Sequence, residues 1–137
     1  MKKDRSERGA AAVEFAIILP VLLLLLIGIM EFGFLFNQQI SASNAAREGA
    51  RYAAVHYSDS GYTDALVQSQ AKSAAPTLNM VMPIVPIYSA GSACSPGTTV
   101  TVKVNVVWNA STRGWLIGYL PFNAPKITGV AVMQCGG

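Results

Sequence analysis

The feature that most constrains this chain is an apolar run near its N-terminus, in which residues 15–30 carry no charge. If the flanking apolar residues 10–36 are included, a helix here has about 27 residues and rises roughly 40 Å. The hydrocarbon core of a bilayer is about 30 Å thick, so such a helix is long enough to cross it. Only 12% of the residues are charged and the mean hydropathy is +0.39, which favours a membrane protein.

The flank before this run, MKKDRSERG, is rich in Lys and Arg and is therefore expected in the cytoplasm. A secretory signal peptide is the alternative, with a small-residue site at residues 41–43 and a mature start near Asn44. The apolar part of such a peptide usually has roughly 7 to 15 residues. The run here is longer and is bracketed by Glu14 and Glu31. We therefore expect one membrane-spanning helix, with the rest of the chain outside the cytoplasm.

The helix is expected to continue beyond the membrane as a stalk. Residues 37–57 are rich in alanine and lack proline, and the sequence SDSG then interrupts the pattern. Pro20, inside the apolar run, removes one backbone hydrogen bond, which membrane helices tolerate. Glu48 is spaced to pair with Arg51 one turn on. Small residues give the upper helix a smooth face for close packing: Ala42, Ala45, Ala46, Ala50, Ala53 and Ala54.

The N-terminal segment carries a specific resemblance. Gly9 follows a short basic leader, small residues begin at Ala10, and Glu14 and Phe15 are the fifth and sixth residues after the glycine. This arrangement resembles the class III signal of type IV pilins. More narrowly, the first 54 or so residues, with EFG at 31–33 and NAAREGARYA at 44–53, resemble the TadE-like minor pilins, or pseudopilins, of tight-adherence (Flp-type) pilus systems. The remainder of the chain is similar in pattern more than in residues.

This resemblance implies cleavage by a prepilin peptidase after Gly9, with Ala10 as the new N-terminus. Ala10 stands where type IV pilins commonly have Phe, which leaves N-methylation open. A carboxylate at Glu14 can then neutralise the new α-amino group of the same or a neighbouring subunit and offset part of its own burial cost. The alternative is that Glu14 lies in the headgroup zone beside Arg8.

Further contacts between this helix and other subunits are expected along its length. Glu31 is either such a contact or an interfacial acid whose side chain reaches toward the headgroups. The expected partners are the prepilin peptidase, other pilin subunits and the inner-membrane pilus platform. The candidate helix-packing residues are Pro20, Glu31, Gly33, Arg47, Glu48 and Arg51.

The C-terminal part predicts a small α+β module. Residues 63–75 read as a short helix with Asp64 in its first turn. Residues 83–89 are a weak strand that Pro86 confines to an edge. Residues 98–108 alternate valines with polar residues and are the clearest strand, and residues 127–134 supply a third. We expect a small antiparallel sheet packed on the upper part of the long helix, with a leader at 1–9, a transmembrane and stalk helix at 10–57 and an exoplasmic module at 58–137.

Cys94 precedes the central strand and Cys135 ends the last one. In an oxidising compartment these two thiols are expected to form a disulfide that staples a small module, and two buried free thiols are the alternative. Two cysteines alone do not make a zinc site, so no metal is expected. Trp115 and Phe122 lie in a segment broken by Gly and Pro. They pack in the core or form a docking patch for a neighbouring subunit or the bilayer surface.

Catalysis and nucleic-acid binding find little support. Residues 65–137 contain no Asp or Glu, so the module has no carboxylate pair for acid–base chemistry, and the chain has no P-loop. His56, Ser58, Asp59 and Asp64 could form a catalytic or cation site, but such residues are ordinary at a helix end. The net charge of +3 is scattered, which disfavours nucleic acid. We expect no enzyme and no cofactor.

Three functions remain open. The first is a processed minor pilin or pseudopilin that acts structurally in assembling or initiating a pilus. The second is an unprocessed, membrane-anchored adaptor of the same apparatus. The third is a secreted binding module or enzyme released by an ordinary signal peptidase.

Overall fold

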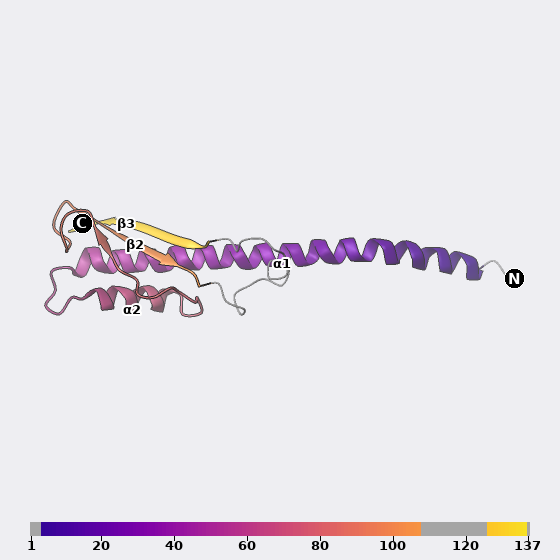
Figure 1. Cartoon of the computed structure of the whole chain (residues 1–137), viewed down its shortest axis with the longest axis horizontal. Helices are drawn as coiled ribbons and strands as arrows, with labels where there is room; N and C mark the ends of the chain where they lie inside the picture. Colours follow the sequence, from indigo (N-terminus) through magenta and orange to yellow (C-terminus); the bar gives the residue numbers. More distant parts are fainter. Residues whose placement is uncertain (1–3, 108–125, 137) are drawn as a thin grey trace.

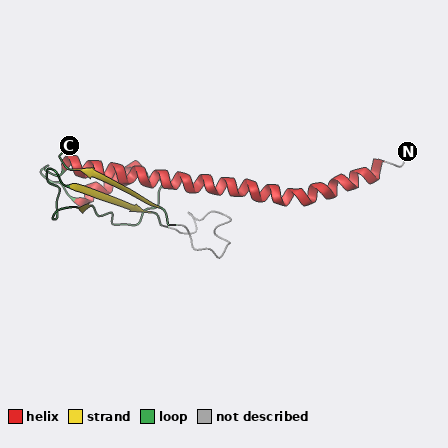
Figure 2. Ribbon diagram, turned by 90° about the horizontal axis from the view of Figure 1, so that it is seen from above, coloured by secondary structure: helices red, strands yellow, loops and turns green. Residues whose placement is uncertain are grey.

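One helix runs the length of the molecule, and a small module packs against its C-terminal end (Figure 1). The computed structural model describes residues 4–107 and 126–136. Helix α1 spans Asp4–His56 and helix α2 spans Asp64–Ala74. Three strands follow, β1 (Ile87–Tyr88), β2 (Thr99–Asn105) and β3 (Thr128–Gln134). Figure 2 shows the strands gathered beside one end of α1. The predicted α+β architecture is confirmed.

Helix α1 begins within the residues that the sequence predicts as a leader and passes through Pro20 without ending. It ends at His56, one residue before the predicted boundary. The turn that follows closes on the helix end, where the Asp59 N–H donates to the His56 carbonyl over 3.0 Å. Gly61 adopts a φ of +98°, a conformation that favours glycine. The predicted SDSG interruption therefore reverses the chain.

Helix α2 packs beside the upper part of α1. Its Val67 and Ala71 lie one turn apart and are fully buried. A Cβ at Gly49 of α1 would lie 3.3 Å from the Ala71 Cβ and 3.3 Å from Cγ1 of Val102. Glycine at this position therefore lets α1, α2 and the sheet approach one another closely.

The sheet has the order β1-β2-β3 and both pairings are antiparallel. The alternation predicted for β2 is confirmed, because its valines at 100, 102 and 104 are fully buried while Lys103 and Asn105 are exposed. Strand β1 lies at the edge of the sheet, as predicted from Pro86, but it has only two residues where the sequence predicted a weak strand over residues 83–89. Val102 pairs with Ala131, which lies at the centre of β3.

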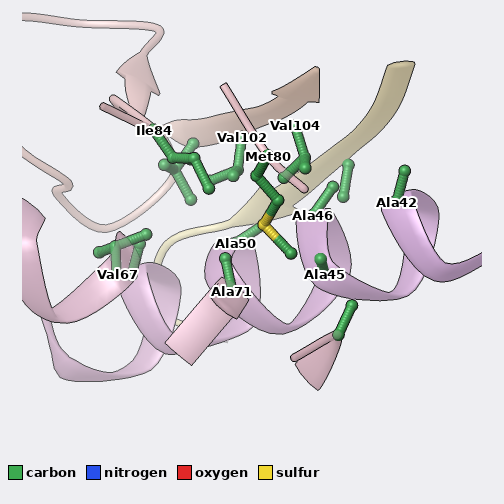
Figure 3. Close-up of a cluster of buried hydrophobic side chains, with 14 of the residues drawn as sticks. Ala42, Ala45, Ala46, Ala50, Val67, Ala71, Met80, Ile84, Val102 and Val104 are labelled. Carbon is green, nitrogen blue, oxygen red and sulfur yellow. The ribbon is translucent and has the colours of Figure 1, made fainter. Parts of the chain in front are cut away.

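The core lies between the inner face of the sheet, α2 and the alanine face of α1 (Figure 3). Small side chains allow the sheet to approach the helix backbone, as at Gly129, where a Cβ would overlap the Ala42 carbonyl. All six predicted alanines of this face are at most 5% exposed. The small-residue face of the stalk is therefore covered by the chain's own module.

The C-terminal end of the module is fixed in two ways. Cys94 and Cys135 form the expected disulfide, with their Cα atoms 5.7 Å apart, and both cysteines are buried. The Gly136 N–H donates to the Ala54 carbonyl of α1 over 3.3 Å. The bridge therefore ties the loop before β2 to the end of β3, and the Gly136 hydrogen bond ties that end to the top of the helix.

Candidate functional site

Below the module, α1 is exposed on all sides. Its most apolar 18-residue window has a mean hydropathy of 2.8, and none of that window is buried. Large apolar side chains stand exposed there, such as Phe15 at 62%, Leu24 at 63% and Met30 at 74%. By length and composition this helix could cross a membrane. A bare apolar surface of this extent needs lipid or other helices as its surroundings.

The predicted processing residues lie at the lower end of this bare helix. Gly9, Ala10 and Glu14 are exposed, and a Cβ at Gly9 would meet no atom within 4 Å. Glu14 lies four residues after Ala10, so both are on one face of the helix. Pro20 and Gly33 are exposed as well. The roles predicted for these residues stay predictions.

Glu31 lies on a buried face of α1. It lies on the same helix face as Leu35, Gln38 and Ala42, and the side of α1 that bears it is covered by the chain itself. Glu31 is only 8% exposed. The role predicted for Glu31, a contact with another subunit or an interfacial acid, stays a prediction.

Gln38 was not singled out by sequence reasoning. It is 7% exposed, and its Oε1 accepts no hydrogen bond within the described part of the chain. It borders a groove of about 370 Å³ that also involves Asn37 and Thr77. Its spacing from Ala42 and Ala45 places Gln38 on the buried face of the helix. This spacing could have predicted its burial from the sequence.

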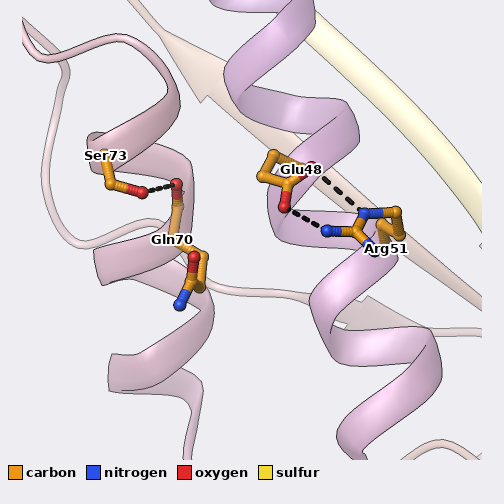
Figure 4. Close-up of polar contacts among 4 residues, drawn as sticks. All are labelled: Glu48, Arg51, Gln70 and Ser73. Carbon is orange, nitrogen blue, oxygen red and sulfur yellow. Dashed lines mark hydrogen bonds and ion pairs between the residues drawn. The ribbon is translucent and has the colours of Figure 1, made fainter.

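Above the bare apolar part, the other face of α1 carries charges. The predicted Glu48–Arg51 ion pair is present, with Arg51 Nη2 donating to Glu48 Oε1 over 2.6 Å and Nε donating to Oε2 over 3.1 Å (Figure 4). Arg47 is exposed and has no hydrogen bond or ion pair to any residue that the structure describes. A groove of about 480 Å³ runs along this face. Its lining consists of Asn44, Arg47, Glu48, Arg51, Ser73, Ala74 and Met133.

The cluster expected near the end of α1 is used for structure. His56 Nδ1 lies 2.6 Å from Asp59 Oδ2, and the His56 ring stacks on Tyr52. Asp64 belongs to a separate series of hydrogen bonds. The Tyr88 hydroxyl donates to Asp64 Oδ1 over 3.0 Å and lies 2.7 Å from the Tyr62 hydroxyl. Burial, followed by these hydrogen bonds, raises the pKa of Tyr88 well above its ordinary value.

In the described part of the chain, no three His, Cys, Asp or Glu side chains are grouped so that they could hold a metal ion. The predicted docking residues Trp115 and Phe122 lie outside the described residues. The candidate site is therefore the exposed surface of α1, apolar in its lower part and polar above.

Comparison with known proteins identifies the segment that carries this surface. Residues 9–51 match the family model of TadE-like proteins. Searches of curated proteins and of solved structures gave no significant match. The match confirms the resemblance predicted from the sequence, and it lies entirely within α1. The TadE-like segment thus includes the bare apolar helix and the charged groove residues of α1, and it ends before α2.

Proposed function

We propose that this chain is a minor pilin or pseudopilin of a tight-adherence pilus, processed by a prepilin peptidase after Gly9. One observation carries the proposal. Within the TadE-like segment, the lower helix is apolar and bare, while the upper helix is covered on one side by the chain's own module. A helix of this kind can lie in a bilayer as a monomer and exchange lipid for neighbouring helices on assembly.

Under this proposal the N-terminus is cytoplasmic and the module lies outside the inner membrane. The basic residues before Gly9 support this orientation. The Cys94–Cys135 disulfide supports an oxidising compartment for the module. The role is structural. The lower helix packs with other pilin subunits, and the module contacts the platform or the fibre.

Glu14 has a defined task in this scheme. Cleavage after Gly9 creates an α-amino group at Ala10, one helical turn from the Glu14 carboxylate. A charged group held at membrane depth is costly unless it is paired. Glu14 therefore neutralises this amine, within one subunit or between neighbours, and favours lateral packing of the helices.

The secreted alternative conflicts with the packing. Cleavage before Asn44 would remove Ala42, which is fully buried against Gly129. It would also remove Gln39, whose Nε2 donates to the Thr128 carbonyl over 3.1 Å. The module would lose part of the helix surface on which β3 lies.

The test is the N-terminal sequence of the protein from native membranes, read by mass spectrometry with and without the host's prepilin peptidase. We expect a start at Ala10 that depends on the peptidase. An intact Met1 or Lys2 would instead support the membrane-anchored adaptor. A start near Asn44 would overturn both membrane-bound functions.

A further inference from the structure

We infer that the groove on α1 above the membrane receives a carboxylate-bearing helix from a neighbouring, different subunit of the assembly. This inference rests on the proposed function, because it assumes that α1 packs beside other membrane-anchored helices. It goes further by naming the surface, the direction of the partner helix and the charge that the partner must carry.

The surface is a single ridge of exposed side chains along the upper part of α1, which we call the α1 ridge. The apolar members are well exposed, with Phe36 at 66%, Ile40 at 59% and Val55 at 51%. Successive positions are three or four residues apart, so they form a continuous ridge that winds gradually around the helix. The ridge consists of Phe36, Ile40, Asn44, Arg47, Arg51 and Val55.

The groove around the charged part of the α1 ridge is lined by residues of α2 and of the sheet. Ser73 and Ala74, at the end of α2, form one wall and Met133 of β3 forms the other. Figure 4 shows the last turns of α2, with Gln70 and Ser73, beside Glu48 and Arg51 of α1. At about 480 Å³ the groove has room for several side chains of a partner.

The charges in the groove favour a carboxylate. Arg51 already has Glu48 as its partner, while Arg47 has no ion pair in the part of the chain that the structure describes. The groove therefore carries an excess of one positive charge. A second copy packed in register would present the same Arg47 and the same excess charge, so like charges would face each other. A different subunit with an acidic residue at this level is the complementary occupant.

The partner is expected to be a helix that runs parallel to α1. The α1 ridge continues upward from the bare apolar helix, so a helix that leaves the membrane beside α1 meets Phe36 and Ile40 first. Arg47 lies seven residues above Ile40, which is two turns or about 10 Å along the axis. The partner helix should therefore place an apolar residue at the Ile40 level and an acidic residue about two turns above it.

Site-specific photocrosslinking in the assembling host tests the contact. A photoreactive residue replaces Ile40 or Asn44, and Val132 serves as the control, because it is 58% exposed on the sheet. We expect crosslinks from Ile40 and Asn44, and not from Val132, to a helix of another pilus subunit. Mass spectrometry of the crosslinked peptide should identify a carboxylate within two turns of the crosslinked site.

Charge reversal tests the chemistry. Arg47→Glu should reduce the crosslink from Ile40 about fivefold or more, since an attraction becomes a repulsion, while Arg47→Lys should largely retain it. Lys103→Glu is the matched control, because Lys103 is exposed on β2 and the change in charge is the same. Replacing the partner's carboxylate by Lys should restore the crosslink to Arg47→Glu. Thermal unfolding of each variant confirms that the module is folded.

The outcomes separate this inference from the proposed function. If the chain starts at Ala10 and reaches the pilus fraction but Ile40 crosslinks to nothing, or only to a second copy of the chain, the inference is wrong and the proposed function stands. A crosslink that Arg47→Glu leaves unchanged also overturns it. If the chain is never processed, the proposed function fails, whatever the crosslinks show.

Discussion

Gly129 is a residue at which the sheet lies directly against the backbone of the long helix. A Cβ placed there would overlap the Ala42 carbonyl and crowd the Ser43 nitrogen. Backbone atoms cannot move aside as a flexible side chain can, so the packing of β3 on α1 depends on the missing side chain. The position matters because this contact holds the module against the stalk of the TadE-like segment.

Gly129→Ala is therefore expected to lower the free energy of unfolding of the module by about 1–3 kcal/mol. Guanidinium unfolding of the full chain in detergent micelles, followed by near-ultraviolet circular dichroism, measures the change. Gly33→Ala is the control, because a Cβ there would meet no atom within 4 Å and should cause no loss. Equal stability of the two variants would show that β3 does not lie this close to α1.

Tyr88 should make the module sensitive to alkaline pH. Burial, and then the hydrogen bonds with Tyr62 and Asp64, raise its pKa above the ordinary value of 10.0. In the unfolded chain Tyr88 ionises near pH 10, while in the folded module it keeps its proton. Ionisation of Tyr88 therefore stabilises the unfolded state before the folded one. The free energy of unfolding should fall as the pH rises above about 10.

Tyr88→Phe should lower the melting temperature at pH 8, because Asp64 and Tyr62 lose a hydrogen-bond partner at a cost of about 1 kcal/mol. It should also lose less stability than the unaltered chain between pH 9 and pH 11. Thermal unfolding at pH 8, 9 and 11 measures the two effects. Tyr57→Phe, outside this hydrogen-bond chain, should retain the full alkaline loss, and the same loss in Tyr88→Phe would contradict the assignment.

At the scale of the elements, strand β2 organises the module. It pairs on both sides and turns its valines toward α1 and α2. Burying each methyl or methylene group contributes about 0.8 kcal/mol, and a cavity left in a close-packed core adds to the cost of removing one. The inner face of the sheet should therefore be far more sensitive to truncation than its outer face.

The same substitution on the two faces tests this. Val102→Ala, at a fully buried site, should cost about 1.5–3 kcal/mol of stability. Val132→Ala on β3, where the side chain is 58% exposed, should change stability by no more than about 0.5 kcal/mol. Chemical unfolding of both variants under identical conditions gives the comparison. Similar losses at the two sites would mean that the register of the sheet is wrong.

Local patterns were sufficient to predict most of these elements. The alternation around Val102 predicted β2, Pro86 predicted an edge strand, and the alanines predicted the buried face of α1. The burial of Glu31 was not predicted, because it depends on which side of α1 the rest of the chain covers. The groove at Arg47 was not predicted either, since its walls come from the end of α2 and from Met133, far away in the sequence. The periodicity of a sequence describes one helix or strand at a time. It does not predict which distant segments come into contact.

At the scale of the whole molecule, the chain has two parts that differ in what stabilises them. The module has a core of its own, made from α2, the sheet and the alanine face of α1. The lower helix makes no buried contact within its most apolar window and depends on its surroundings. Changes in the lower helix should therefore alter assembly without altering the stability of the module.

Glu14 provides the sharpest test of this separation. Glu14→Gln keeps the shape of the side chain but removes the charge. If the chain is processed as proposed, the α-amino group at Ala10 would then remain in the membrane without its carboxylate. Breaking one partner of a buried ion pair costs about 3–5 kcal/mol. We expect unchanged processing after Gly9 and unchanged thermal unfolding of the module, but at least tenfold less of the chain in the pilus fraction, as quantified by mass spectrometry. Ile17→Ala, at an equally bare site, should leave incorporation close to normal. If Glu14→Gln entered the pilus fraction as well as the unaltered chain does, neutralisation of the amine would not be the task of Glu14.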